Sequence, residues 1–310
     1  MNTTLAPAVE AQAEISPSRR ASVWRTLARS PSVLFGVVVL VFITLVGLAA
    51  PILHTTDPAA IDPANRNKRP GYEATLRNAD GTTTSLTHWM GTDSLGRDVY
   101  SRVVYGARVS LLIGVAVAAA SISIGLFIGL LVGYFRLVDN IVMRVMDGMM
   151  AIPAILLALS LVSLLSAGLT TVIIAISITE IPRVVRLVRS VVLSVREEPY
   201  VEAAISVGTP TWLLLIRHVL PNTISPLIVQ ATYIAAHAIL IEAVLSFLGV
   251  GIPADTPTWG NIMAEGRALF RLFPHNIFYP GLFLALSVLA VNILGDGLRD
   301  ALDPRMRERA

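Results

Sequence analysis

Long apolar runs alternate with polar stretches along this chain of 310 residues. Five runs cover about 33–53, 109–134, 142–165, 225–248 and 277–294, and another starts near Gly168 and continues past Glu180 and Pro182. A helix that crosses a bilayer needs about 20 apolar residues. The pattern therefore predicts an all-α membrane protein with six transmembrane helices.

The composition agrees with a membrane protein and disfavours other classes. Hydrophobic residues make up 54% of the chain, charged residues make up 15%, and the mean hydropathy is +0.69. Soluble chains carry about 25% charged residues. The net charge of +3 comes from arginines that flank the apolar runs, which indicates contact with membrane lipid rather than with nucleic acid. The chain has no cysteine, which excludes disulfides and thiolate metal sites.

The basic residues also predict an orientation. Of 24 lysines and arginines, 15 fall on one side of the predicted membrane and nine on the other. Because inner loops are enriched in these residues, the first side is expected to be cytoplasmic. The expected segments are a cytoplasmic tail over 1–31, a first transmembrane helix over 32–53, a long external loop over 54–108 and a cytoplasmic tail over 298–310. Within the external loop, Asp80-Gly81 predicts a hairpin turn between strands near 72–76 and 82–86.

Three glycines mark one face of the second predicted helix. Gly125, Gly129 and Gly133 recur every four residues, which places them in one row. Small residues at this spacing let two helix backbones approach closely in lipid. Helix packing is therefore expected here, and glycine without a packing role is the alternative.

Three acidic residues fall inside the predicted helices. A charge at the bilayer centre costs about 2.5–3.5 kcal/mol or more, so each is expected to face a cavity or a partner. Asp147 and Glu180 are expected to pair with nearby arginines such as Arg144 or Arg183. Glu242 lies deeper and is expected to face the bundle, with His237 as a hydrogen-bonded packing residue that does not pair with it. All three acids are candidates for polar groups that line a pore.

A polar island between two apolar runs predicts a helix, a sharp corner and a second helix. Pro199 suits the first turn of a helix, and Gly208 suits a C-terminal position with positive φ. Thr209 is then expected to cap the second helix, with Pro210 in its first turn. Glu202 lies near the start of the first helix, where the helix dipole favours a negative charge.

The spacing within this island carries a family resemblance. Glu202-Ala203-Ala204 is followed after three residues by Gly208, and after nine more by His218-Val-Leu-Pro221. This resembles the cytoplasmic loop of bacterial ABC importer permeases. A histidine at 218, where an aliphatic residue is usual, is similar to the oligopeptide and dipeptide branch. Further stretches that resemble this branch are 91–98 with 101–108, 245–249 with 257–260, and 292–305.

The resemblance is closest to the second permease subunit of dipeptide, oligopeptide, glutathione and nickel importers. It implies a type I ABC importer permease domain over 109–297, in a bacterial inner membrane with both termini cytoplasmic. It also implies a homologous second permease subunit, two ATP-binding subunits and an extracytoplasmic solute-binding protein. The coupling loop that it implies spans 194–222 and contains Glu202, Ala203, Ala204, Gly208, His218, Leu220 and Pro221.

Energy for such transport is expected to come from other subunits. A phosphate-binding loop needs a lysine between glycine and Ser or Thr, whereas Lys68 lies between Asn67 and Arg69. We therefore expect no cofactor on this chain, with ATP-Mg on the partner subunits and no catalytic residue here. A self-sufficient secondary transporter is the alternative from another class, and it would usually show an internal repeat. A helix lying on lipid is the alternative for the island.

Overall fold

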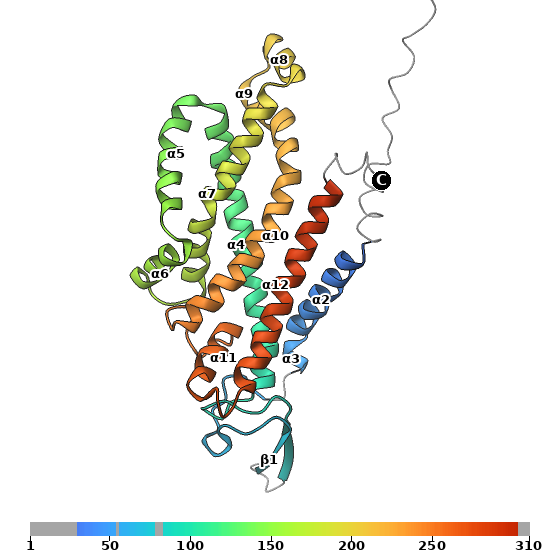
Figure 1. Cartoon of the computed structure of the whole chain (residues 1–310), viewed down its shortest axis with the longest axis vertical. Helices are drawn as coiled ribbons and strands as arrows, with labels where there is room; N and C mark the ends of the chain where they lie inside the picture. Colours follow the sequence, from blue (N-terminus) through green and yellow to red (C-terminus); the bar gives the residue numbers. More distant parts are fainter. Residues whose placement is uncertain (1–29, 54–55, 78–82, 303–310) are drawn as a thin grey trace, which may run out of the picture.

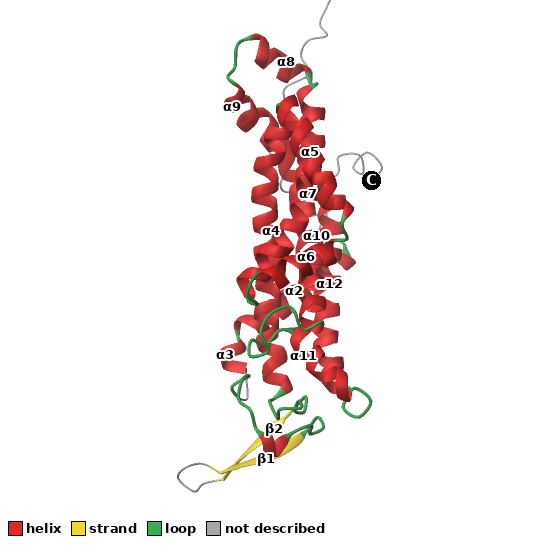
Figure 2. Cartoon of the chain, turned by 90° about the vertical axis from the view of Figure 1, so that its left-hand side faces the viewer, coloured by secondary structure: helices red, strands yellow, loops and turns green. Residues whose placement is uncertain are grey.

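The computed structural model describes residues 30–53, 56–77 and 83–302 and shows an elongated bundle of helices (Figure 1). A two-stranded hairpin lies at one end and a helical elbow lies at the other (Figure 2). The long elements are α2 (Pro31–Leu48), α4 (Val99–Tyr134), α5 (Arg136–Ala151), α6 (Ala154–Leu164), α7 (Leu169–Arg196), α10 (Leu220–Phe247) and α12 (His275–Leu302). The short elements are α3 (Ala50–Leu53), η1 (Pro63–Asn65), β1 (Tyr72–Arg77), β2 (Thr83–His88), α8 (Pro199–Ser206), α9 (Thr211–Leu214), η2 (Leu215–Val219), α11 (Trp259–Gly266) and η3 (Arg267–Leu269).

Four helical stretches of the described chain are long and apolar enough to cross a membrane. They are Pro31–Leu48, Val99–Tyr134, Thr211–Phe247 and His275–Leu302. The pair α5 and α6 adds a fifth if it is counted as one span. The helix α7 has sufficient length, but Glu180 and its arginines interrupt its apolar sequence. The fold is thus a multi-span helical bundle with four or five apolar spans in the described residues, rather than six of equal character.

The predicted third helix is the largest correction to the expected pattern. The sequence predicts one apolar helix over 142–165, but the chain bends by 94° between α5 and α6. The break falls at Ile152 and Pro153, which both have extended backbone. Proline lacks the N–H that a continuing helix needs and restricts the residue before it. The bend therefore follows from Pro153.

Several other boundaries also differ from the expected ones. The helix α4 starts ten residues before 109, because Asp98 accepts a hydrogen bond from the Ser101 N–H at 2.8 Å and caps it. The end of the predicted external loop is therefore helical. The first predicted helix is divided at Ala49 into α2 and α3. The last helix, α12, continues to Leu302, beyond the predicted end of its apolar run at 294.

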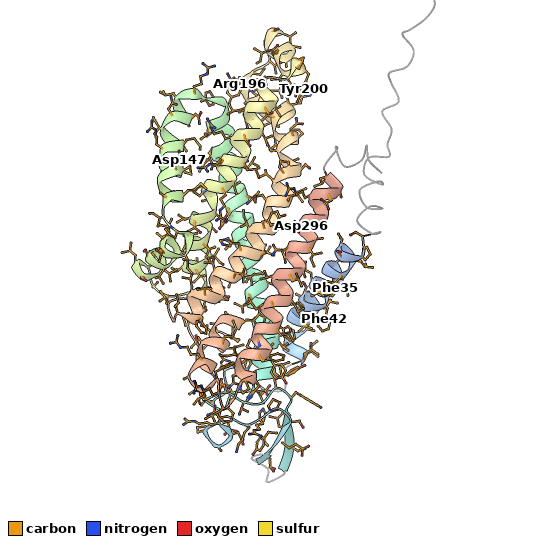
Figure 3. All side chains as sticks on the ribbon, viewed as in Figure 1. Phe35, Phe42, Asp147, Arg196, Tyr200 and Asp296 are labelled. Carbon is orange, nitrogen blue, oxygen red and sulfur yellow. The ribbon has the colours of Figure 1, made fainter. Side chains whose placement is uncertain are left out.

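The helix α4 forms the centre of the bundle. It packs most extensively on α7 and then on α10, while α2 packs on α12 and on α4. The largest buried cluster joins α4, α6, α7 and α10 through small and β-branched residues such as Val117, Val184 and Val188. Phe35 and Phe42 on α2 are 48% and 58% exposed (Figure 3). Exposed aromatic side chains on an apolar helix fit a lipid environment.

The hairpin is present in the described residues. Strands β1 and β2 pair antiparallel, in a register that runs from Tyr72 opposite His88 to Arg77 opposite Thr83. The predicted Asp80-Gly81 turn lies outside the described residues. The hairpin extends from the end of the bundle that is farthest from α8 (Figure 2).

Candidate functional site

The elbow begins with α8, whose two ends have the predicted chemistry. Pro199 occupies its first turn. At its other end Gly208 has φ +78°, its N–H donates to the Ile205 carbonyl at 2.9 Å, and the Thr209 N–H donates to the Ala204 carbonyl at 3.0 Å. These paired bonds form a Schellman motif, which needs a left-handed residue that glycine adopts without a Cβ penalty. The corner is therefore fixed by Gly208.

The second arm of the elbow starts one residue later than the sequence predicts. Pro210 is the N-cap of α9, with ψ 144°, and neither it nor Thr209 provides a side-chain cap. The predicted cap at Thr209 and first-turn position of Pro210 are thus wrong, because the extended backbone of Pro210 holds it outside the helix. The π-helical turn η2 then joins α9 to α10 without a break. The second arm of the elbow is therefore continuous with α10.

Apolar side chains are exposed over the elbow. Glu202 and Ala203 are exposed, and Ala204 is partly exposed. Val207 is 81% exposed and Trp212 is 64% exposed. This surface extends beyond the rest of the bundle (Figure 2). A projecting surface with small residues, exposed apolar groups and one carboxylate can bind a protein partner.

The predicted coupling residue His218 holds the two arms together. Its ring lies against that of Tyr200, with centroids 6.0 Å apart. The Asn222 amide donates to the His218 carbonyl at 2.7 Å and to the Tyr200 hydroxyl at 3.2 Å. Sequence reasoning did not select Tyr200, which lies at the start of α8 (Figure 3). The sequence feature that could have indicated Tyr200 is an aromatic residue directly after the helix-starting Pro199.

The glycine row on α4 faces α7. A Cβ built on Gly125 would lie 2.5 Å from the Cβ of Val184, and one on Gly129 would lie 2.6 Å from the Cβ of Val188. Gly133 meets Val192 in the same way, at 2.5 Å. No real Cβ fits at these distances. The close approach of α4 and α7 therefore depends on the missing side chains of the three glycines.

Ion pairs join α7 to α5 on another face. Asp147 accepts from Nη2 of Arg186 at 2.7 Å, and Asp139 accepts from Nε of Arg189 at 2.5 Å. Asp147 thus pairs with an arginine, as expected, but with Arg186 rather than with Arg144 or Arg183. Which arginine it meets depends on how α5 packs along α7, which the sequence does not specify. Both Asp147 and Arg186 are more than half exposed, so this pair contributes little stability.

Glu180 links α7 to α10. Its carboxylate is buried and lies 3.2 Å from Nη1 of Arg183, a partner that the sequence predicts, and 2.8 Å from Nδ1 of His237. Glu242 is separate from this group. It is fully buried and accepts from the Ser246 hydroxyl at 2.8 Å, and it contacts neither His237 nor Glu180 by any hydrogen bond in the described chain. Glu242 therefore faces the bundle.

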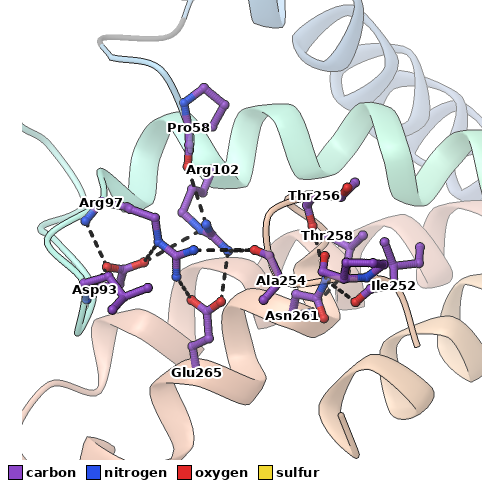
Figure 4. A network of polar contacts seen from close by, with 12 residues as sticks. Pro58, Asp93, Arg97, Arg102, Ile252, Ala254, Thr256, Thr258, Asn261 and Glu265 are labelled. Atoms are coloured by element: carbon purple, nitrogen blue, oxygen red, sulfur yellow. Dashed lines mark hydrogen bonds and ion pairs between the residues drawn. The ribbon is translucent and has the colours of Figure 1, made fainter. Parts of the chain in front are cut away.

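An arginine network lies at the hairpin end (Figure 4). Arg97 donates from Nε to Asp93 at 2.7 Å and from Nη2 to Glu265. Arg102 is fully buried, and it contacts Glu265 at 3.4 Å and the Pro58 carbonyl at 3.4 Å. The network joins the loop before α4, α4 itself and α11. Sequence reasoning quoted this stretch for its resemblance and assigned it no contact.

The same network holds the segment between α10 and α11. Both arginines approach the Ala254 carbonyl, and the Asn261 amide donates to three carbonyls, those of Ile252, Pro253 and Thr256 (Figure 4). Burial raises the pKa of the Glu265 carboxyl, although the charges of Arg102 and Arg97 act in the opposite direction. Desolvation thus offsets part of the attraction, and the main effect of the network is to fix position.

Comparison with known proteins gives two family matches. The family described as binding-protein-dependent transport system inner membrane component matches residues 121–308. The N-terminal transmembrane domain of oligopeptide transport permease C matches residues 17–70. Together these matches include the elbow, the glycine row and Glu180.

Three relatives illustrate the similarity. A probable peptide ABC transporter permease protein of Sinorhizobium fredii is 50% identical over 288 residues, which cover 93% of this chain and 94% of that protein. A dipeptide transport system permease protein of Alkalihalophilus pseudofirmus is 38% identical over 94% of this chain and 91% of that protein. A glutathione transport system permease protein of Pectobacterium atrosepticum is 42% identical over 72% of this chain and 74% of that protein.

Proposed function

This chain belongs to the family of binding-protein-dependent transport system inner membrane components, and on that premise we propose that it is one permease subunit of an ATP-driven importer of di- or oligopeptides. The full-length similarity to a probable peptide permease and to a dipeptide permease supports this solute class. Glutathione is an alternative from the same family, supported by a relative that carries that name. A nickel complex or another small solute is a further alternative.

The elbow is the observation that carries the proposal. It presents Ala203 and Ala204 with little side-chain bulk, so that a partner can approach the α8 backbone. The left-handed corner at Gly208 and the unbroken path from α9 into α10 suit a lever that moves α10 when α8 is displaced. We assign the residues 194–222 to the contact with an ATPase, with Glu202, Leu220 and Pro221 as members of that loop.

The proposed arrangement in the membrane follows from this contact. The elbow end is cytoplasmic, the hairpin end is external, and both termini are cytoplasmic. Six crossings are obtained if the α5–α6 pair and α7 are the third and fourth. The protein then works with a homologous second permease, with two ATPases that bind ATP-Mg, and with an external solute-binding protein at the hairpin end.

Transport by the complete complex is the direct test. Proteoliposomes that contain both permeases, both ATPases and the loaded binding protein are expected to take up a dipeptide when ATP is supplied. Omission of this chain should abolish uptake, and uptake that persists without it would contradict the assignment.

The coupling role has its own test. Replacement of Gly208 by valine should strain the corner, because a β-branched residue does not adopt φ near +78° without cost. ATP hydrolysis by the complex should continue while uptake falls. If uptake and hydrolysis keep their wild-type ratio, the elbow does not couple them. Uptake by the purified single chain under an ion gradient alone would instead favour a secondary transporter.

A further inference from the structure

A charged group between α7 and α10 remains unexplained by the coupling role. The side chain of Glu180 is 1% exposed, whereas those of its two partners, Arg183 and His237, are 45% and 33% exposed. The carboxylate therefore lies behind the other two groups. Nη1 of Arg183 and Nδ1 of His237 both contact Oε1 of this carboxylate, at 3.4 and 2.8 Å, so the guanidinium and the imidazole lie next to each other.

Both partners keep groups that this carboxylate does not use. Among the described residues, Arg183 makes its polar contacts through Nη1, and His237 makes its contact through Nδ1. Because an ionised carboxylate can only accept, Nδ1 carries the proton in this contact. Nε and Nη2 of Arg183 are left to donate to a molecule on the exposed side, and Nε2 of His237, with the proton on Nδ1, is left to accept from it. A guanidinium fork matches a carboxylate in shape and charge.

Polar character continues from this group towards the elbow end. Gln230 lies seven residues before His237, on the same face of α10, and Leu187 lies one turn beyond Arg183 on α7. Both line a cavity of 470 Å³ that α12 completes through Arg299. Residues of three helices thus line a partly polar space on the elbow side of the charged group.

Contact with lipid does not account for this face. Charged side chains within membrane-spanning segments face the bundle interior, a partner or a water-filled cavity. The lipid-type surface of this protein is of a different kind, as Phe35 and Phe42 on α2 show (Figure 3). The seam between α7 and α10 therefore fits the side of the permease that borders the solute path.

We propose that, with both groups held in place by Glu180, Nε2 of His237 accepts a hydrogen bond from the transported solute and Arg183 binds its carboxylate on the way through the permease. For a peptide this group is its C-terminal carboxylate. This inference rests on the proposed function as an importer. Glu180 is a positioning residue, since it is buried behind the two groups that contact the solute.

The test compares a dipeptide that has a free carboxylate with the same dipeptide as its C-terminal amide. Both are offered to the complete complex in proteoliposomes, with saturating binding protein and ATP. Because wild type and variants use the same binding protein, its own preference cancels when the uptake ratio of acid to amide is compared between them. The variants are Arg183→Gln and Arg183→Lys, with Arg186→Gln as the matched control from the next turn of α7.

Arg183→Gln is expected to lower the acid-to-amide ratio about tenfold, the factor for loss of one hydrogen bond to a charged group. Arg183→Lys should give an intermediate ratio, and Arg186→Gln should keep the wild-type ratio. Equal loss of both peptides in Arg183→Gln, or an unchanged ratio in Arg183→Lys, would overturn the proposal. Absence of ATP-dependent uptake by the wild-type complex would instead reject the proposed function itself.

A labelling experiment gives a readout that does not depend on transport. The chain has no cysteine, so Arg183→Cys introduces a single thiol, and Phe127→Cys provides a control at an exposed apolar position of α4. A water-soluble thiosulfonate should modify Cys at 183 and not at 127, as measured by mass spectrometry of this chain. The dipeptide should slow the reaction at 183, because the bound solute covers this position. An unreactive thiol at 183, or a reaction that the dipeptide does not slow, would contradict the proposed contact.

Discussion

Substitution of Gly129 by alanine tests how closely α4 and α7 approach. The added Cβ would lie 2.6 Å from the Cβ of Val188 and 2.9 Å from its Cγ1, whereas carbon atoms pack at about 3.5–4.0 Å. The helices must then separate by about 1 Å along a contact that continues to Gly125 and Gly133.

The net sign follows from two opposing terms. Alanine in a helix interior is favoured over glycine by about 0.5–1 kcal/mol. Overpacking of a well-packed contact costs about 1–3 kcal/mol. The steric term is larger, so Gly129→Ala should destabilise the protein by about 0.5–2 kcal/mol.

Thermal unfolding of the purified complex in detergent measures this effect as a lower Tm. Gly148→Ala is the matched control, because a Cβ there meets no atom within 4 Å and only the helix preference remains. That variant should be as stable as the wild type or slightly more stable. A Gly129→Ala/Val188→Gly double variant should lose less than the sum of the two single losses, since the Cβ at 188 that the new alanine would meet is then absent.

A steric limit on the spacing of α4 and α7 is refuted if Gly129→Ala and Gly148→Ala have the same Tm. It is also refuted if the double variant loses the full sum of the two single effects, because the two sites would then be independent. Either result would mean that the spacing of α4 and α7 is not limited by this contact.

The elbow and the hairpin end offer three further tests. Gly208→Asn should retain more ATP-dependent uptake than Gly208→Val, since asparagine tolerates the left-handed backbone region. Equal uptake by the two variants would show that the backbone at residue 208 can leave this region without loss of transport. Gly96→Ala should lower the Tm more than Gly71→Ala. Both glycines have positive φ, but of the two only Gly96 would clash, because its added Cβ would overlap the Asp62 carbonyl oxygen. Similar losses in the two variants would leave backbone strain as the sole cause. Arg102→Met should lower the Tm by the equivalent of up to about 3–5 kcal/mol, because it removes one of the cations that pair with the carboxylate of Glu265. An unchanged Tm would mean that Glu265 becomes protonated instead.

The sequence by itself determined the class of the protein and the chemistry of its elbow. Apolar runs longer than a bilayer crossing needs leave few alternatives to a helical membrane protein, since every backbone group must be paired in lipid. Gly208 was identifiable because a left-handed corner favours glycine for local steric reasons. The row of Gly125, Gly129 and Gly133 was identifiable because helical spacing alone places the three on one face.

Only the tertiary structure decided which residues meet across helices. The partner of Asp147 is Arg186 rather than Arg144 or Arg183, and Glu180 meets His237, which is 57 residues away along the chain. The sequence pattern specifies which face of a helix a residue occupies. It does not specify how far one helix is shifted along its neighbour, because that shift depends on side-chain packing along the whole contact, such as the fit of Val188 against Gly129.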